Sequence, residues 1–159
     1  MRGSIDDLFK GLEDYKKSLR AKAAVLAKAL AEAGCGAVSI TYGVWPYRGP
    51  REVDVTVEQR GETSYAIVAN GKTVLFLEFG AGVSYSANQH PLAGTIEGGP
   101  YGPGTYPGQV HAMDLWGWYL PKEAGGGHTY GNAPSMAMYN TAKSLREVIE
   151  EVARGVFRG

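Results

Sequence analysis

The sequence predicts a single α+β domain spanning residues 1–159. We expect a long N-terminal helix, an antiparallel sheet of about four or five strands, and a C-terminal helix packed on the sheet. Three observations predict this fold. Apolar residues recur at three- and four-residue spacing near the start, alternate with polar residues between residues 37 and 79, and return to helical spacing from about Pro134. Because one face of such a sheet must be covered by helices, a helix–sheet–helix layering is expected.

The first helix is expected over residues 5–33. Acidic residues lie early in this segment and basic residues later, an order that complements the helix dipole. Gly34 and Gly36 are natural stops. A helix of this length would run about 44 Å, as far as a compact domain of this size is wide, so it either breaks or leaves one end free for a neighbour. Its apolar stripe consists of Ile5, Leu8, Leu12, Tyr15, Leu19, Leu26 and Leu30.

The sheet is predicted from a change of period. Val53, Val55 and Val57 alternate with polar residues, as in a half-buried strand. Two turn signals, at residues 60–61 and 70–71, separate short strands, and the Asn-Gly pair of the second is the preferred type I′ hairpin turn. Short connections favour an antiparallel meander. The predicted strands cover residues 37–42, 52–58, 63–69 and 73–79.

The last segment is predicted to be helical from about Pro134. Its apolar residues fall at intervals of four and three, which defines a seam that packs on the sheet or on the first helix. The seam consists of Met138, Ala142, Leu145, Ile149, Val152 and Val156.

Residues 80–134 do not fit either pattern. These 55 residues hold 13 glycines, six prolines and seven tyrosines or tryptophans, but only four charged residues. Enrichment in aromatics with depletion of charge is typical of an interface core, so we expect an arm ordered by neighbouring subunits. The alternative is a long hairpin with a strand over residues 114–120 and self-packed loops. The aromatic residues of the arm are Tyr85, Tyr101, Tyr106, Trp116, Trp118, Tyr119 and Tyr130.

Composition excludes several classes of protein. Lys+Arg and Asp+Glu number 16 each, so the chain lacks the basic excess that binding to nucleic acid or anionic lipid requires. The single cysteine, Cys35, excludes a disulfide framework and a cysteine-based zinc cage. No apolar run approaches the roughly 18 residues of a membrane span. We therefore expect a soluble intracellular protein with no membrane partner and no sequence-specific binding to nucleic acid.

One motif suggests an enzyme. Residues 74–82 form an apolar run that ends in Glu78 and a Gly-x-Gly turn, similar to the nucleotide-binding loop of methyltransferases. A small nucleotide- or S-adenosylmethionine-binding enzyme that uses the turn from Glu78 to Gly82 is therefore an alternative. Against it, Ser84 occupies the place of the third glycine and no helical period follows. The three histidines match no metal-binding spacing, and we expect neither a metal, a cofactor nor a catalytic residue.

Two sequence blocks resemble a known family. Residues 76–82, Phe-Leu-Glu-Phe-Gly-Ala-Gly, resemble the "(V/L)EFGTG" block of the neck and tail-completion proteins of long-tailed bacteriophages. Gly117-Trp118-Tyr119, then residues 128–131, then residues 134–139 with Ala142, are similar in order and spacing to the second block of that family. With the opening helix and the sheet, the likeness covers nearly the whole chain.

The resemblance implies a structural virion protein and no enzyme. Such proteins form a homo-oligomeric ring, expected here to be a hexamer, at the head–tail junction. The ring lies between the head-closure (connector) protein and the tail terminator or tail tube protein, and DNA passes through it. The protein would be made in the host cytoplasm. A tail terminator remains a further alternative. The resemblance and the aromatic arm together suggest subunit-interface residues, although plain folding roles are the alternative for each. They are Glu78, Gly80, Gly82, Tyr85, Tyr101, Tyr106, Trp116, Trp118, Tyr119, His128, Gly131, Met138 and Tyr139.

Overall fold

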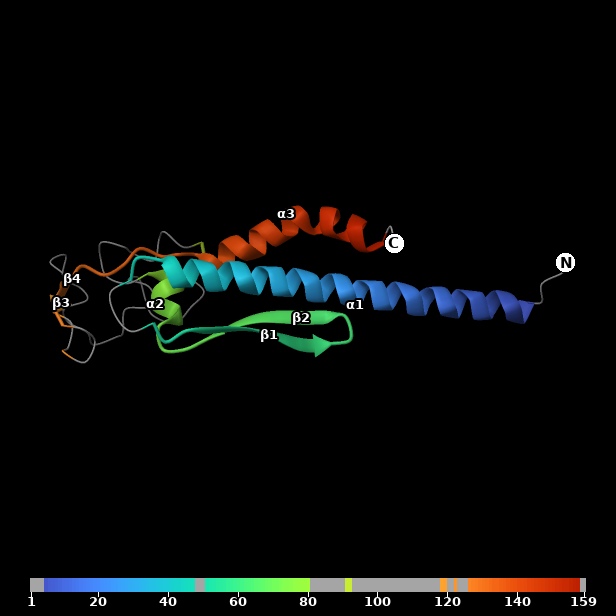
Figure 1. The fold of residues 1–159 in the computed structure, drawn as a ribbon, viewed down its shortest axis with the longest axis horizontal. Coiled ribbons are helices and arrows are strands. Elements are labelled where there is room, and N and C mark those ends of the chain that lie inside the picture. The colour runs from blue at the N-terminus through green and yellow to red at the C-terminus, as the bar shows by residue number, and fades with distance from the viewer. Residues whose placement is uncertain are drawn as a thin grey trace.

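The computed structural model describes residues 5–47, 51–80, 91–92, 118–119, 122 and 126–157. The fold is α+β, with a long N-terminal helix, a two-stranded antiparallel sheet and a C-terminal helix (Figure 1). The helices are α1 (Ile5–Val44), α2 (Val74–Phe79) and α3 (Ala137–Phe157), and the strands are β1 (Asp54–Gly61), β2 (Ser64–Asn70), β3 (Trp118–Tyr119) and β4 (His128–Thr129). Strands β1 and β2 form one sheet, and β3 and β4 form a second, separate one.

Helix α1 is longer than predicted, because it continues through Gly34 and Gly36 to Val44. The prediction of a strand over residues 37–42 is therefore wrong. The alternation of residues 37–42 fits a strand, but Val38 and Tyr42 also extend a helical series of buried positions that begins at Ala31 and Gly34. The hydroxyl of Thr41 donates a hydrogen bond of 2.9 Å to the carbonyl of Ala37, which satisfies this side chain within the helix.

The hairpin β1–β2 confirms two predicted strands. The strands pair antiparallel with Val57 opposite Ile67. They are joined by a turn at Glu62 and Thr63, two residues after the predicted turn at residues 60–61, which belong to β1. The second predicted hairpin turn is wrong: after Asn70 the chain passes through Gly71 into α2 instead of returning as a strand. Gly71 has φ 135°, and a Cβ there would lie 1.9 Å from the carbonyl oxygen of Glu52, so glycine is required by the close approach of the chain to the start of β1.

Residues 73–79, predicted as a strand, form α2 instead. The amide of Leu77 donates to the carbonyl of Thr73 at 3.0 Å, which closes the first turn. Three consecutive residues of this helix, Leu77 to Phe79, are buried. A short helix that is buried on several sides has the same continuous apolar sequence as a buried strand, which is why the sequence did not distinguish them. The sheet of four or five strands is thus not confirmed.

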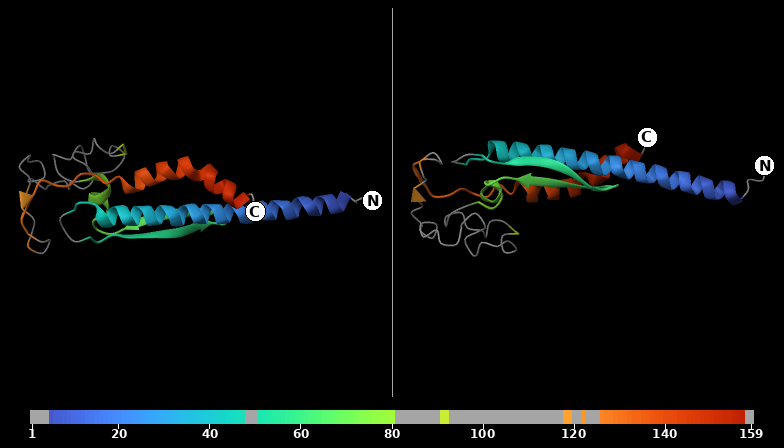
Figure 2. Two further views of the ribbon diagram at one scale, coloured as in Figure 1. Left: turned by 45° about the horizontal axis from the view of Figure 1, so that its top comes forward. Right: turned by 90° about the horizontal axis from the view of Figure 1, so that it is seen from below.

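Helix α3 confirms the predicted C-terminal helix and its boundaries within a few residues. It packs along α1, and the hairpin lies on α1 as well (Figures 1 and 2). The prediction that this helix packs on the sheet, in a helix–sheet–helix layering, is therefore wrong: α1 is the middle layer, because its buried positions face both the hairpin and α3. The three elements meet over Gly34. A Cβ at Gly34 would lie 2.5 Å from Cδ1 of Ile67 in β2 and 2.9 Å from Cδ1 of Leu145 in α3. Gly34 therefore serves close packing and does not end the helix.

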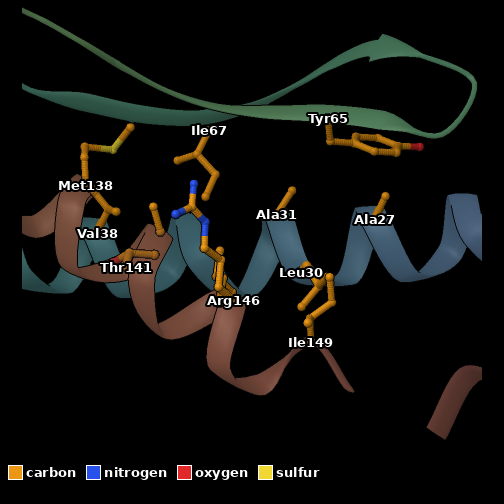
Figure 3. A pocket seen from close by; sticks show the side chains of 12 residues that line it. Ala27, Leu30, Ala31, Val38, Tyr65, Ile67, Met138, Thr141, Arg146 and Ile149 are labelled. Atoms are coloured by element: carbon orange, nitrogen blue, oxygen red, sulfur yellow. The ribbon is translucent and has the colours of Figure 1, made fainter. Parts of the chain in front are cut away.

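A groove opens where α1, β2 and α3 meet (Figure 3). Its volume is about 370 Å³, and side chains from all three elements line it, including Leu30 of α1, Tyr65 of β2 and Ile149 of α3. Figure 3 shows Leu30 of α1 and Ile149 of α3 side by side.

The core is small and lies at the C-terminal end of α1. Its fully buried cluster consists of Val38, Tyr42, Leu77 and Ala137, with Trp45 and Met138 among the half-buried side chains packed around it. The N-terminal part of α1 extends beyond every other described element (Figures 1 and 2). Large apolar side chains along that part are exposed to solvent.

Among the described residues, α1 is the one helix long and apolar enough to cross a membrane, since an 18-residue window in it has a mean hydropathy of 1.5. The prediction that no segment approaches a membrane span therefore needs correction. Core helices of soluble proteins pass the same test but are mostly buried, whereas 17% of this window is buried within the structure. The hairpin and α3 lie along α1 with exposed charged side chains, which hydrocarbon would not accommodate. These side chains are Arg60, Glu62, Lys143, Arg146, Glu147, Glu150 and Glu151.

Candidate functional site

The carboxylate of Glu78 is a buried hydrogen-bonding centre. The side chain is 4% exposed. Its Oε2 accepts a hydrogen bond of 2.8 Å from the hydroxyl of Tyr42 and one of 3.0 Å from the amide of Met138. Its Oε1 accepts one of 3.0 Å from the amide of Tyr139. Both oxygens are thus held by groups of the same chain, from α1 and from the start of α3.

These contacts cap α3. The helix begins at Ala137, so the amides of Met138 and Tyr139 are among the first four, which have no partner inside the helix. A negative charge at this end also interacts favourably with the helix dipole. The capping group comes from 60 residues earlier in the chain and not from the residue before the helix. Glu78 therefore fixes where α3 begins and in which direction it leaves.

Further hydrogen bonds join the same two segments. The amide of Ser135 donates to the carbonyl of Leu77 at 2.8 Å, and the side-chain amide of Asn132 donates to the carbonyl of Phe76 at 2.7 Å. Gly80 has φ 77°, and a Cβ there would lie 2.7 Å from the carbonyl oxygen of Asn132. Glycine is therefore required at this position by both conformation and space. We refer to residues 76–80 together with residues 132–139 as the junction.

The junction brings together the two sequence blocks that carry the family resemblance. Glu78, Gly80, Met138 and Tyr139, all predicted site residues, meet there through contacts within one chain. The structure thus gives Glu78 and Gly80 a folding role. That these residues also contact a neighbouring subunit stays a prediction.

Sequence reasoning missed two side chains that hydrogen-bond to the junction, Tyr42 and Trp45. Tyr42 was assigned to a strand, yet it is completely buried and donates to Glu78. Burial, the adjacent Glu78 carboxylate and the hydrogen bond to it raise the pKa of Tyr42 far above its ordinary value. Trp45 donates from its indole nitrogen to the carbonyl of Ala133 at 2.9 Å. The sequence did offer a signal for these two residues: a Tyr and a Trp stand three residues apart just before a proline. Buried Tyr and Trp side chains need polar partners, so this pair indicates hydrogen bonds to another segment.

A cavity of about 580 Å³ lies beside the junction. Tyr42, Glu78, Phe79 and Leu92 are among the residues that line it. The exposed bases Lys143 and Arg146 of α3 lie at the same cavity. The cavity thus combines an apolar lining with two bases, and the one acid that lines it, Glu78, is already hydrogen-bonded.

A second cluster, the distal cluster, lies at β3 and β4, at the end of the molecule away from the N-terminus (Figure 1). Tyr119 pairs with His128 across the strands, and the ring of His128 packs edge-on against both Tyr119 and Tyr130, with ring centroids 4.9 and 4.8 Å apart. Tyr119 is 79% and Tyr130 54% exposed. Gly131, with φ 97°, donates its amide to the hydroxyl of Thr129 at 3.0 Å and turns the chain toward the junction. The distal cluster therefore presents aromatic rings to solvent.

The remaining predicted site residues are only partly placed. Trp118 lies in β3 opposite Thr129. The others fall outside the described residues; they are Gly82, Tyr85, Tyr101, Tyr106 and Trp116.

The described residues offer little for catalysis. No group of three His, Cys, Asp or Glu side chains in this part of the chain lies close enough to hold a metal ion. Cys35 is half-buried and donates from Sγ to the carbonyl of Val55 at 3.3 Å. Glu78 lies in a short helix with its carboxylate hydrogen-bonded, so it does not stand at the end of a strand where a nucleotide ribose would be bound.

No protein-family model, no curated protein and no solved structure matches this chain. Its function is therefore inferred from the motif blocks, from the junction they form and from the surfaces left exposed.

Proposed function

We propose that the protein is a structural virion component of the phage head–tail junction and acts as a subunit of a homo-oligomeric ring. The observation that carries this proposal is the excess of apolar side chains on the outside. Among the described residues, six hydrophobic residues are buried, whereas sixteen large ones are exposed. Single exposed apolar residues are ordinary, but eight of these sixteen gather along the free part of α1 and at the distal cluster. Such surfaces are typical of a subunit that is completed by neighbours.

The resemblance to neck and tail-completion proteins supports the virion role. The residues that carry it, Glu78, Gly80 and residues 134–139, bind the last helix to the rest of the fold. A structural task for these blocks agrees with a family that has no catalytic residues. In this proposal the ring is a hexamer that contacts the head-closure protein on one face and the tail terminator or tail tube protein on the other.

In the ring, the small sheet is extended. Within the described residues the hairpin has one unpaired edge on β1 and one on β2, and unpaired edges add further strands readily. We infer that strands from neighbouring copies extend this two-stranded sheet.

The enzyme alternative makes a different prediction. A nucleotide or S-adenosylmethionine bound by the turn from Glu78 to Gly82 would need Gly80 open to the ligand, yet the carbonyl of Asn132 occupies that space. A thermal-shift screen with nucleotides and S-adenosylmethionine separates the two, since a clear rise in melting temperature would count against a structural role.

The direct experiment is assembly. The chain is co-expressed with the products of neighbouring genes, and the complexes are examined by mass measurement and by electron microscopy. We expect closed rings of six subunits bound to one head or tail component. A chain that never enters such a complex but gains stability from a nucleotide would overturn the proposal. A ring that caps isolated tails and does not bind the head-closure protein would favour the tail terminator.

A further inference from the structure

We propose that the N-terminal segment of α1, residues 5–22, pairs antiparallel with the same segment of a second copy of this chain. We call this segment the stalk. The inference concerns the free protein and does not rest on the proposed function. Figures 1 and 2 show the stalk extending past the hairpin and past α3.

The stalk carries one continuous apolar stripe, which nothing covers among the described residues. Five of its residues follow intervals of three and four, the seam spacing of paired helices, and Phe9 widens the seam on one side. The exposed fractions along the stripe run from 75% at Ile5 to 37% at Leu19. The members are Ile5, Leu8, Phe9, Leu12, Tyr15 and Leu19.

The area of the stripe is sufficient for a specific contact. At an average of about 100 Å² or more of exposed surface for each residue, the six members present roughly 600–800 Å², close to one partner's share of a standard interface. A patch of this size exceeds what single copies of soluble proteins ordinarily expose. The stripe also lies on the side of α1 that continues toward Leu30, where α3 provides the cover further along the helix (Figure 3).

Charge selects a second copy in antiparallel orientation. Residues 5–15 carry four acids and one base, whereas residues 16–22 carry four bases and no acid. Two parallel stalks would place acids beside acids and bases beside bases. In the antiparallel pair, the acidic part of each stalk runs along the basic part of the other, so opposite charges attract along both halves of the contact.

The seam residues set the register. An overlap centred between Leu12 and Tyr15 places Leu8 of one copy beside Leu19 of the other. The next seam position is Lys22, which then lies opposite the second copy's Ile5 and beside its Asp6. The contact uses the same patch on both copies, so it is two-fold and distinct from the head-to-tail contacts that close a ring.

The first test is the mass of the purified full chain across protein concentrations from about 10 µM to about 1 mM. We expect a species of twice the 17.0 kDa chain mass. Leu12→Asp should weaken its association about 100-fold, as expected at the centre of an interface. Ile40→Asp is the matched control, because Ile40 is 68% exposed on the same helix but lies outside the stalk, and it should leave the dimer unchanged.

Orientation is tested by disulfide formation in a Cys35→Ser background. A Leu8→Cys chain mixed with a Leu19→Cys chain should give a crosslinked heterodimer, while either chain alone should crosslink far less. A preferential Leu8–Leu8 crosslink would indicate parallel stalks and overturn the proposal. So would a chain that stays monomeric at every concentration, including one that instead binds vesicles of phosphatidylcholine and phosphatidylglycerol. The Leu12→Asp chain also separates this proposal from the proposed function. If that chain still forms rings although its stalks no longer pair, ring formation does not depend on the stalk.

Discussion

The carboxylate of Glu78 accepts hydrogen bonds from groups 36, 60 and 61 residues away in the chain. Local capping groups usually come from the residue just before a helix, where a serine or aspartate needs no tertiary structure to act. Here the cap is available only when α1, α2 and α3 are all in place. In the sequence Glu78 resembles a catalytic acid. In the structure it instead links α2, to which it belongs, to α1 and α3 through hydrogen bonds.

Replacing Glu78 with Gln should destabilise the fold by about 2–3 kcal/mol, because the amide NH₂ would face a backbone N–H or the Tyr42 hydroxyl instead of accepting from it. For a chain of this size, that corresponds to a fall in melting temperature of roughly 5–10 °C. Glu62→Gln, in the exposed turn between β1 and β2, is the matched control and should change it little. Equal melting temperatures for both variants would show that the junction contributes no stability.

Tyr42 gives a prediction for alkaline pH. Its pKa is raised in the folded state above the 10.0 of a free tyrosine, so the folded protein keeps a proton that the unfolded chain releases. The contribution of Tyr42 is complete below about pH 10, and the free energy of unfolding should then fall by about 1.4 kcal/mol per pH unit above it.

The measurement is denaturant unfolding between pH 9 and pH 11, compared with Tyr42→Phe. The variant should lose about 1–2 kcal/mol at neutral pH, because one hydrogen bond to Glu78 is gone. The free energy of unfolding of the variant should also fall less steeply as the pH rises above about 10. Parallel declines in the two proteins would mean that Tyr42 ionises normally in the fold.

At the scale of elements, α1 contacts both the hairpin and α3, and its two halves differ in how far their apolar side chains are covered. The C-terminal half is packed by the hairpin and α3, and Gly34 lets both approach closely. The N-terminal half offers large side chains and receives no cover from the described chain. The helix thus combines a core element and an exposed surface in one continuous rod of about 60 Å.

Gly34→Leu should destabilise the protein by about 1–3 kcal/mol, because the added atoms would displace Ile67 and Leu145 from the meeting point of the three elements. The matched control is Gly36→Leu. Nothing lies within 4 Å of a Cβ at Gly36, so that change should be neutral or stabilise the helix by up to about 0.8 kcal/mol. Thermal unfolding measures both, and a loss at Gly36 as large as at Gly34 would contradict the packing role.

Elements whose pattern has one interpretation could be predicted from the sequence. The valine alternation of β1 and the seam of α3 are of this kind, and both were found. Residues 37–42 fit period two and the helical series alike, and the choice was decided by Val38 and Tyr42 packing on Leu77 and Ala137. The same limit applies to the candidate site. The two motif blocks were recognised, but that Glu78 would cap α3 depends on tertiary contacts that no local pattern encodes.

At the scale of the whole molecule, the described chain has a small core at one end and exposed apolar surface elsewhere. Stability therefore depends on the junction more than in a compact domain of equal length, and association depends on surfaces separate from it. The exposed stalk supports both the proposed ring and the proposed stalk pairing, whereas the distal cluster supports the ring alone, so substitutions in the distal cluster should leave the stalk pairing unaffected.

Deleting residues 93–108 should leave a folded chain that no longer joins virus particles. The deleted segment, which falls outside the described residues, contains two of the arm tyrosines predicted to contact neighbouring subunits, Tyr101 and Tyr106. Calorimetry of the purified variant and its incorporation into particles are the two measurements. Loss of cooperative melting would show that the segment belongs to the core.

The position of Ala137 and Met138 against α1 has a consequence for synthesis on the ribosome. Val38 and Tyr42 are made about 95 residues before the helix that closes over them. At translation rates of about 5–20 residues per second, that face of α1 waits roughly 5–20 s for its cover. Throughout this interval the nascent chain exposes apolar side chains on both halves of α1. The yield of folded protein in a host should therefore depend on the supply of chaperones that bind emerging polypeptides.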